Sequence, residues 1–164
     1  MTRYRVGTGL DAHRLVEGRP LTLGGVSVPY ARGLEGHSDG DCVLHALCDA
    51  LLGAAGQGDM GRHFPSTDPR WKGTASLRFV AEVATLLAAD GWELENADLT
   101  VIAQAPPLAP HADAMRDAIA TALAVTPERI SVKAKSTDGL GAFGRGEGIA
   151  AMASVLLRRD RDAV

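Results

Sequence analysis

Hydrophobic and polar positions follow two different periods along the chain, and these periods predict where strands and helices lie. Alternating or short continuous apolar runs, typical of strands, occur in YRVGTGL (4–10), PLTLGGVSVPY (20–30), the later part of WELENADLTVIAQA (92–105) and RISVKAK (129–135). Gly24 and Gly25 divide the second segment into the two short strands of a hairpin. The segment GIAAMASVLLRR (148–159) fits a helix or a strand, and its glycine-rich entry and Val-Leu-Leu end favour a strand.

Apolar residues recur every three or four positions in three further segments, and this spacing predicts helices. These segments are 41–55, 74–90 and about 110–124. Ser38, three residues before Asp41, predicts the start of the first helix. The resulting order of elements predicts an α+β fold, with a mixed β-sheet, helices packed on one of its faces and a small β-hairpin. The other face of this sheet would need burial, so we expect an oligomer.

Length and composition bound the class of protein. A chain of 164 residues with 46% hydrophobic residues can form one core, so we expect a single domain over 1–164. The net charge of −3 comes without acidic or basic blocks, so we expect neither nucleic acid nor a membrane surface as partner. The apolar stretches are shorter than the roughly 20 residues of a membrane span, and no leader pattern begins the chain. We therefore expect a cytoplasmic protein, with Cys42 and Cys48 reduced, that binds small molecules or copies of itself.

The segment GLDAHR (9–14) places an acid and a histidine just beyond the first predicted strand. In an extended segment, Asp11 and His13 project to the same side and offer an oxygen and a nitrogen to one point. His45 in the predicted helix supplies a third donor, and this set suits Zn²⁺ with an open fourth position. Asp49, one turn after His45, would accept the other N–H of its ring. A plain turn and a surface Asp–His pair explain the same residues, so spacing alone leaves both interpretations open.

Two further segments have the composition of phosphate-binding turns. His37, Ser38 and Asp39 precede a predicted helix N-terminus, where free backbone N–H groups favour an anion, although helix capping alone would also explain them. The segment KAKSTDGLGAFGRGEG (133–148) follows a strand and carries two hydroxyls and the carboxylate of Asp138, which suits Mg²⁺ between two phosphates. A surface turn is the alternative there, and a plain connector is the alternative for the glycine-containing loop 58–68. Because no strong nucleophile stands out, the residues favour phosphoryl transfer in which the substrate supplies the nucleophile.

With these residues assembled, the chain resembles the 2-C-methyl-D-erythritol 2,4-cyclodiphosphate synthase family over nearly its whole length. The resemblance rests on GLDAHR, GGVSVPYARGLEGHSDGDCVLHALCDALLGAAGQGDMGRHFP, DPRWKG, IAQAPPLAPH and GRGEGIA. The block from 36 to 61 is highly specific, whereas GRGEG alone would be a weak signal.

The resemblance implies an enzyme, a CMP-forming phosphorus–oxygen lyase of non-mevalonate isoprenoid biosynthesis. It would convert 4-diphosphocytidyl-2-C-methyl-D-erythritol 2-phosphate into the cyclic diphosphate by attack of the 2-phosphate on the β-phosphate. The resemblance makes Asp11, His13 and His45 the Zn²⁺ ligands and Asp138 the ligand of a second divalent cation, Mg²⁺ or Mn²⁺. It also implies a homotrimer with active sites between adjacent subunits.

The same resemblance assigns roles to individual residues. His37 and Ser136 fall at positions that stabilise the transition state. Contacts with the substrate are implied for Asp11, His13, His37, Ser38, Asp59, Met60, Gly61, Phe64, Pro65, Ser66, Thr67, Asp68, Ala103, Gln104, Ala105, Pro106, Pro107, Leu108, Ala109, Lys135, Ser136, Thr137, Asp138, Ala142 and Arg145.

The chain departs from the family pattern at three of these positions. The family often has Thr at position 136, and the serine keeps the hydroxyl. It often has Lys at position 107, where proline cannot donate a hydrogen bond, and an aromatic residue at position 142. A metal-dependent phosphohydrolase and a non-catalytic diphosphate-binding trimer are the alternative functions that the residues permit.

Overall fold

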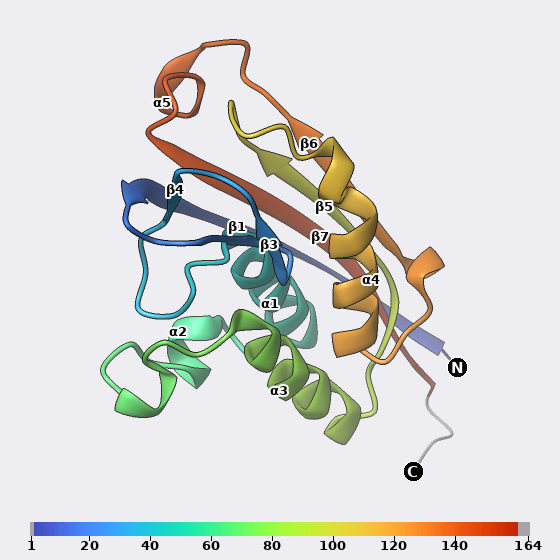
Figure 1. Cartoon of the computed structure of the whole chain (residues 1–164). Helices are drawn as coiled ribbons and strands as arrows, with labels where there is room; N and C mark the ends of the chain where they lie inside the picture. The colour runs from blue at the N-terminus through green and yellow to red at the C-terminus, as the bar shows by residue number, and fades with distance from the viewer. Residues whose placement is uncertain (1, 161–164) are drawn as a thin grey trace.

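The computed structural model describes residues 2–160, in which helices lie against one side of a strongly twisted sheet (Figure 1). The strands are β1 (Thr2–Glu17), β2 (Leu21–Leu23), β3 (Val26–Val28), β4 (Arg32–Leu34), β5 (Glu93–Ile102), β6 (Ile130–Lys135) and β7 (Gly148–Asp160). The helices are α1 (Cys42–Ala55), α2 (Met60–His63), α3 (Ser76–Ala89), α4 (Ala112–Ala122) and α5 (Gly141–Gly144), and three short 3₁₀ turns begin at Pro69, Ala109 and Pro127.

One mixed sheet organises the fold. Its strand order is β4-β1-β7-β5-β6, and β2 and β3 form a separate hairpin. β5 and β6 run parallel, whereas the other neighbours in the sheet pair antiparallel. The predicted α+β class, the hairpin at Gly24 and Gly25, and the strand over 148–159 are therefore confirmed.

The first strand is much longer than its hydrophobic pattern indicated. β1 pairs with β7 from Thr2 opposite Asp160 to Arg14 opposite Gly148. The prediction that Asp11 and His13 lie beyond the end of this strand was therefore wrong, because both residues lie inside it. The continuous ladder with β7 keeps the backbone extended, and alternation places polar side chains on one face without breaking the pairing. The predicted common side of Asp11 and His13 follows from the same geometry.

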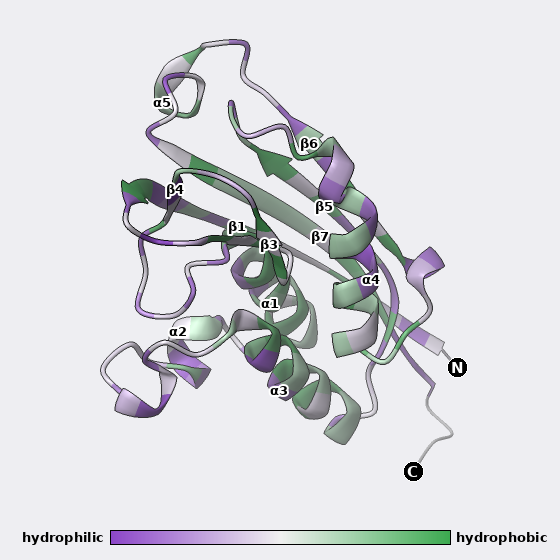
Figure 2. Ribbon diagram, viewed as in Figure 1, coloured by the Kyte–Doolittle hydropathy of each residue, from purple (hydrophilic) through white to green (hydrophobic). Residues whose placement is uncertain are grey.

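Two glycines let β1 lie directly against α1. A Cβ atom on Gly7 would lie 2.0 Å from the carbonyl oxygen of Ala50, and one on Gly9 would lie 2.0 Å from that of Ala46. Strand and helix therefore touch backbone to backbone, which sets the distance between GLDAHR and His45. Figure 2 shows hydrophobic residues along the central strands and the helices packed against them, where the core lies.

The opposite face of the sheet is open in the single chain, as the pattern predicted. Four large apolar side chains of β1 and β7 project there: Tyr4, Val6, Leu10 and Met152, with exposed fractions of 59, 71, 65 and 51%. An apolar surface of this kind on a strand pair is typical of an interface.

Helix α1 does not begin as predicted. Asp41, rather than Ser38, caps it, because the buried Asp41 carboxylate accepts hydrogen bonds from Val43 N and Leu44 N. The same carboxylate accepts from Gly24 N at 3.0 Å and Gly25 N at 2.7 Å, and so ties the hairpin to the helix. Cys42 and Cys48 are buried and unbridged, as expected. Among residues 2–160, no helix is long and apolar enough to cross a membrane.

Candidate active site

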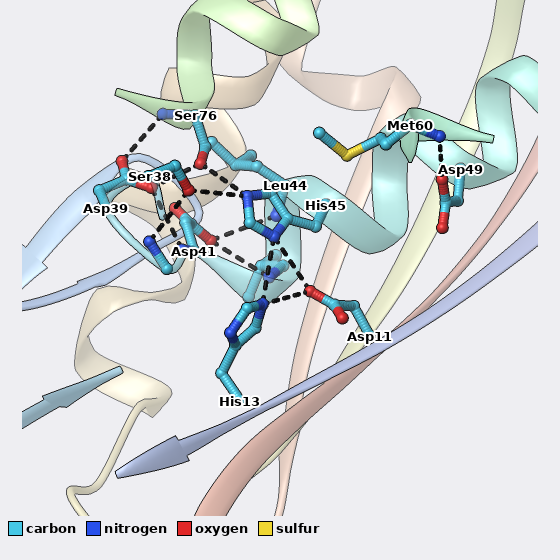
Figure 3. Close-up of polar contacts among 12 residues, drawn as sticks. Asp11, His13, Ser38, Asp39, Asp41, Leu44, His45, Asp49, Met60 and Ser76 are labelled. Carbon is cyan, nitrogen blue, oxygen red and sulfur yellow. Dashed lines mark hydrogen bonds and ion pairs between the residues drawn. The ribbon is translucent and has the colours of Figure 1, made fainter. Parts of the chain in front are cut away.

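Three donor atoms from two distant parts of the chain converge beside the junction of β1 and α1 (Figure 3). Asp11 Oδ2 lies 2.8 Å from His13 Nε2 and 3.0 Å from His45 Nδ1. The two ring nitrogens are 3.2 Å apart. All three side chains are partly buried, so the three donors predicted from the sequence form one cluster.

The far side of each imidazole is held by hydrogen bonds to other groups. His13 Nδ1 donates to the carbonyl oxygen of Glu35 at 2.5 Å, which leaves Nε2 as the nitrogen facing the cluster. His45 Nε2 lies 3.0 Å from Ser76 Oγ and 3.2 Å from Ser38 Oγ. The prediction that Asp49 accepts this N–H was wrong.

Asp49 instead contacts the loop that follows α1. Its Oδ1 accepts a hydrogen bond from Met60 N at 2.8 Å. A side chain four residues after His45 lies on the same stripe of the helix, but it points toward the segment packed against that turn, and here that segment is 59–61.

Hydrogen bonds within the cluster shift the pKa values of Asp11 and His13. Burial alone would raise the pKa of Asp11, but hydrogen bonds from His13 and His45 outweigh this effect and hold the pKa well below its usual value. The hydrogen bond to Asp11 raises the pKa of His13. The carboxylate is therefore ionised and ready to act as a ligand over the physiological pH range.

The donor set fits a divalent transition metal. Ligand distances of about 2.0–2.2 Å place neighbouring donors of a tetrahedral Zn²⁺ roughly 3.3 Å apart. The three observed separations of 2.8, 3.0 and 3.2 Å are close to this value. Two imidazoles and one carboxylate, without a thiolate, are also typical of a catalytic site that keeps one position open.

A second group of predicted residues gathers at the ends of β5 and β6. These strands run parallel and finish together, with Ile102 opposite Lys135, so the segments 103–109 and 135–138 leave the sheet side by side. Gly139 N donates to Gln104 Oε1 at 3.1 Å, which links the two segments. Ser136 Oγ donates to Asp138 Oδ1 at 2.9 Å, and Asp138 has a left-handed backbone with φ of 50°.

Within one chain, this second group is not part of the three-donor cluster. Asp138 does not join Asp11, His13 and His45 in the cluster found among residues 2–160. β7 and β5 lie between β1 and β6, so three strand spacings, about 14 Å, separate β1 from β6.

Ala142 and Phe143, by contrast, lie close to the three-donor cluster. They border a hollow of about 210 Å³ beside residues 12–14. Arg145 Nε donates to Glu147 Oε1 at 2.6 Å, so the two side chains form an ion pair with each other.

The loop after α1 carries the remaining predicted residues. Asp59 caps α2 through Arg62 N, and the ring of Phe64 packs on Phe79 with centroids 4.9 Å apart. Gly61, Pro65, Ser66 and Thr67 are exposed, and Asp68 pairs with Arg70. His37 is exposed in a bend, where its carbonyl accepts from Gly73 N. The loop is therefore a structured segment that contains a short helix.

Comparison with known proteins shows the family of this chain. Residues 4–158 match the YgbB family. The 2-C-methyl-D-erythritol 2,4-cyclodiphosphate synthase of Burkholderia thailandensis is 54% identical over 160 residues, which cover 98% of this chain and 99% of that protein. The chain belongs to the 2-C-methyl-D-erythritol 2,4-cyclodiphosphate synthase family.

Solved structures of this synthase family have the same fold. The bifunctional IspDF of Campylobacter jejuni matches with a TM-score of 0.94 and 41% identity, over 98% of this chain and 43% of that one. The chain thus spans less than half of that bifunctional protein. The CDP complex of Plasmodium falciparum IspF matches with a TM-score of 0.84 and 32% identity, over 96% of this chain and 97% of that one.

Sequence reasoning missed two contacts of the three-donor cluster. Ser76, the first residue of α3, reaches His45 from a helix that no motif connected to GLDAHR. Glu35 contributes only its backbone carbonyl, for which no residue type is required. Because both contacts are tertiary, no spacing in the sequence signals them.

Proposed function

We propose that the chain converts 4-diphosphocytidyl-2-C-methyl-D-erythritol 2-phosphate into 2-C-methyl-D-erythritol 2,4-cyclodiphosphate and CMP, in non-mevalonate isoprenoid biosynthesis. The observation that carries this proposal is the convergence of Asp11, His13 and His45 in a member of this synthase family. In the reaction, an oxygen of the 2-phosphate bonds to the β-phosphorus, the bond from that phosphorus to the bridging oxygen breaks, and CMP leaves with the electron pair. The nucleophile thus belongs to the substrate, consistent with the lack of a protein nucleophile in the motifs.

The chain's own groups hold the charged reactant. Asp11, His13 and His45 would bind Zn²⁺, and Asp138 a second ion, Mg²⁺ or Mn²⁺. Bound there, the two cations supply Lewis-acid polarisation of the β-phosphate and neutralise the diphosphate charge. His37 and Ser136 are the residues we assign to stabilising charge in the transition state, and Ser38 contacts the phosphates.

The remaining residues bind the two ends of the substrate. In this proposal, the loop with Asp59, Met60, Gly61 and 64–68 holds the erythritol part. The paired segments 103–109 and 135–138 hold cytidine and its diphosphate, with Ala142 and Arg145 nearby. The existence of a CDP complex of the related P. falciparum protein supports a cytidine nucleotide as the ligand. Pro107 contributes shape rather than a donated hydrogen bond.

We further propose a homotrimer of single-domain subunits, with each active site between two of them. Two observations support this assembly: the exposed apolar side chains on the open face of the sheet, and the distance across the sheet between the three-donor cluster and Asp138. Apposition of one chain's cluster with a neighbour's β5–β6 end would complete the site. A cytoplasmic location suits the highly charged substrate and product.

Removal of His45 tests the metal and the reaction together. We expect His45→Ala to lose bound zinc and CMP release, whereas His111→Ala, a histidine outside the cluster, keeps its zinc. Phosphorus NMR of the wild-type reaction should show the cyclic diphosphate and equimolar CMP. A product carrying solvent oxygen would favour a metal-dependent phosphohydrolase, and binding without turnover would favour a diphosphate-binding trimer. Unchanged zinc content and CMP release in His45→Ala would refute the proposal.

A further inference from the structure

A chain of hydrogen bonds leads from the three-donor cluster to a carboxylate that no metal-binding motif includes. Ser76 Oγ lies 3.0 Å from His45 Nε2 and donates to Asp39 Oδ1 at 2.5 Å (Figure 3). The second oxygen, Asp39 Oδ2, accepts from Ser76 N at 2.9 Å. Ser76 is fully buried, so no water competes for its hydroxyl.

The positions of the protons follow from the carboxylate end of this chain. An ionised carboxylate only accepts hydrogen bonds, so the single hydroxyl proton of Ser76 must point to Asp39. The oxygen of Ser76 then offers only lone pairs to His45, which favours a proton on His45 Nε2. Ser38 Oγ, 3.2 Å from the same nitrogen, can accept from it as well. When a proton stays on Nε2, Nδ1, which lies 3.0 Å from Asp11, is the nitrogen that gives up its proton and offers its lone pair to a metal.

We propose that Asp39 and Ser76 are positioning residues that orient the His45 ring and hold a proton on Nε2, so that Nδ1 is the nitrogen that binds the metal. This chain of hydrogen bonds from Asp39 through Ser76 to His45, here called the relay, holds the Nε2 proton and the orientation of the ring before a metal binds. This inference rests on the proposed metal site and adds two residues to it.

The competing explanation is purely structural. Ser76 N is one of the amides at the start of α3 that have no partner within the helix, and the residue before it makes no side-chain cap. Asp39 could therefore serve only as a cap supplied from another segment. The two explanations differ at the hydroxyl, because a cap needs Ser76 N and the relay needs Ser76 Oγ.

Ser76→Ala separates the two roles, because it removes the hydroxyl and keeps the backbone amide on Asp39. We expect the apo protein to bind Zn²⁺ about 10- to 100-fold more weakly, as for other lost partners of metal-bound histidines, when measured by competition with a chromogenic chelator. Nitrogen-15 NMR of histidine-labelled apo protein should show His45 Nε2 protonated in the wild type and less fully protonated in Ser76→Ala. Thr85→Ala is the matched control, since the Thr85 hydroxyl lies on the same helix and donates to the carbonyl of Ala81.

Asp39→Asn provides a second variant should Ser76→Ala fold poorly. An amide oxygen can accept only one of the two hydrogen bonds from Ser76 in the original geometry, so zinc affinity should fall again. Wild-type zinc affinity and unchanged protonation of His45 Nε2 in these variants would overturn the relay. If that happens while His45→Ala still loses zinc, the metal site stands and the relay alone is wrong. If His45→Ala keeps its zinc, the proposed site itself fails.

Discussion

Substituting alanine for Gly9 tests whether the contact between β1 and α1 sets the geometry of the proposed metal site. The new Cβ would lie 2.0 Å from the Ala46 carbonyl oxygen, about 1.4 Å inside an ordinary contact of 3.4 Å. Both atoms belong to the backbone or are fixed to it, so the strand and the helix must move apart. Asp11 and His13 lie two and four residues beyond Gly9, and His45 immediately precedes Ala46.

The size of the effect follows from this displacement. Metal–ligand distances tolerate about 0.2 Å, so a separation of roughly 1 Å between the two elements should weaken zinc binding at least about tenfold. Overpacking a backbone contact in the core should cost about 3 kcal/mol of unfolding free energy. Urea unfolding of the apo protein and zinc competition measure the two effects separately.

A matched control substitution lies in α1, the helix that Gly9 contacts. Gly53 is exposed in α1, and a Cβ there meets nothing within 4 Å. Gly53→Ala should therefore raise stability by about 0.5–1 kcal/mol and leave zinc affinity unchanged. A Gly9→Ala protein that loses less than about 1 kcal/mol and binds zinc like the wild type would show that the close approach does not control the site.

Two further predictions concern the binding loop and the sheet. Asp49→Ala frees Met60 N, so we expect KM to rise about fivefold, the equivalent of one hydrogen bond of about 1 kcal/mol, at unchanged kcat and zinc content; a fall in kcat alone would contradict this. The hydrogen bond from Lys133 lowers the pKa of Asp98, so this pair stabilises the fold above about pH 4 and loses that effect as the pH falls through the lowered pKa. Asp98→Asn should cost under about 1 kcal/mol at pH 7, because the pair is exposed. Urea unfolding should show this difference shrinking as the pH falls below about 4 and through the lowered pKa, and a difference that does not shrink would point to another cause.

Much of the candidate site could be predicted because its three donor residues lie in elements with clear local signals. The helical period of 41–55 placed His45 on α1, and alternation in an extended segment placed Asp11 and His13 on one side. The family resemblance supplied the link between these two segments. The cap of α1 could not be predicted in the same way, because Ser38 and Asp41 both suit an N-cap and the buried amides of the hairpin favour Asp41.

By itself, the sequence determined the type and order of the elements and the residue types that can hold a metal. These properties depend on neighbours within a few positions, where period, turn chemistry and side-chain donors act. Only the tertiary structure decided that β1 continues through Asp11 and His13, that Asp49 serves Met60, and that Ser76 reaches His45. Each of these outcomes depends on hydrogen bonds between segments distant in the chain, and such partners are selected by packing rather than by local spacing.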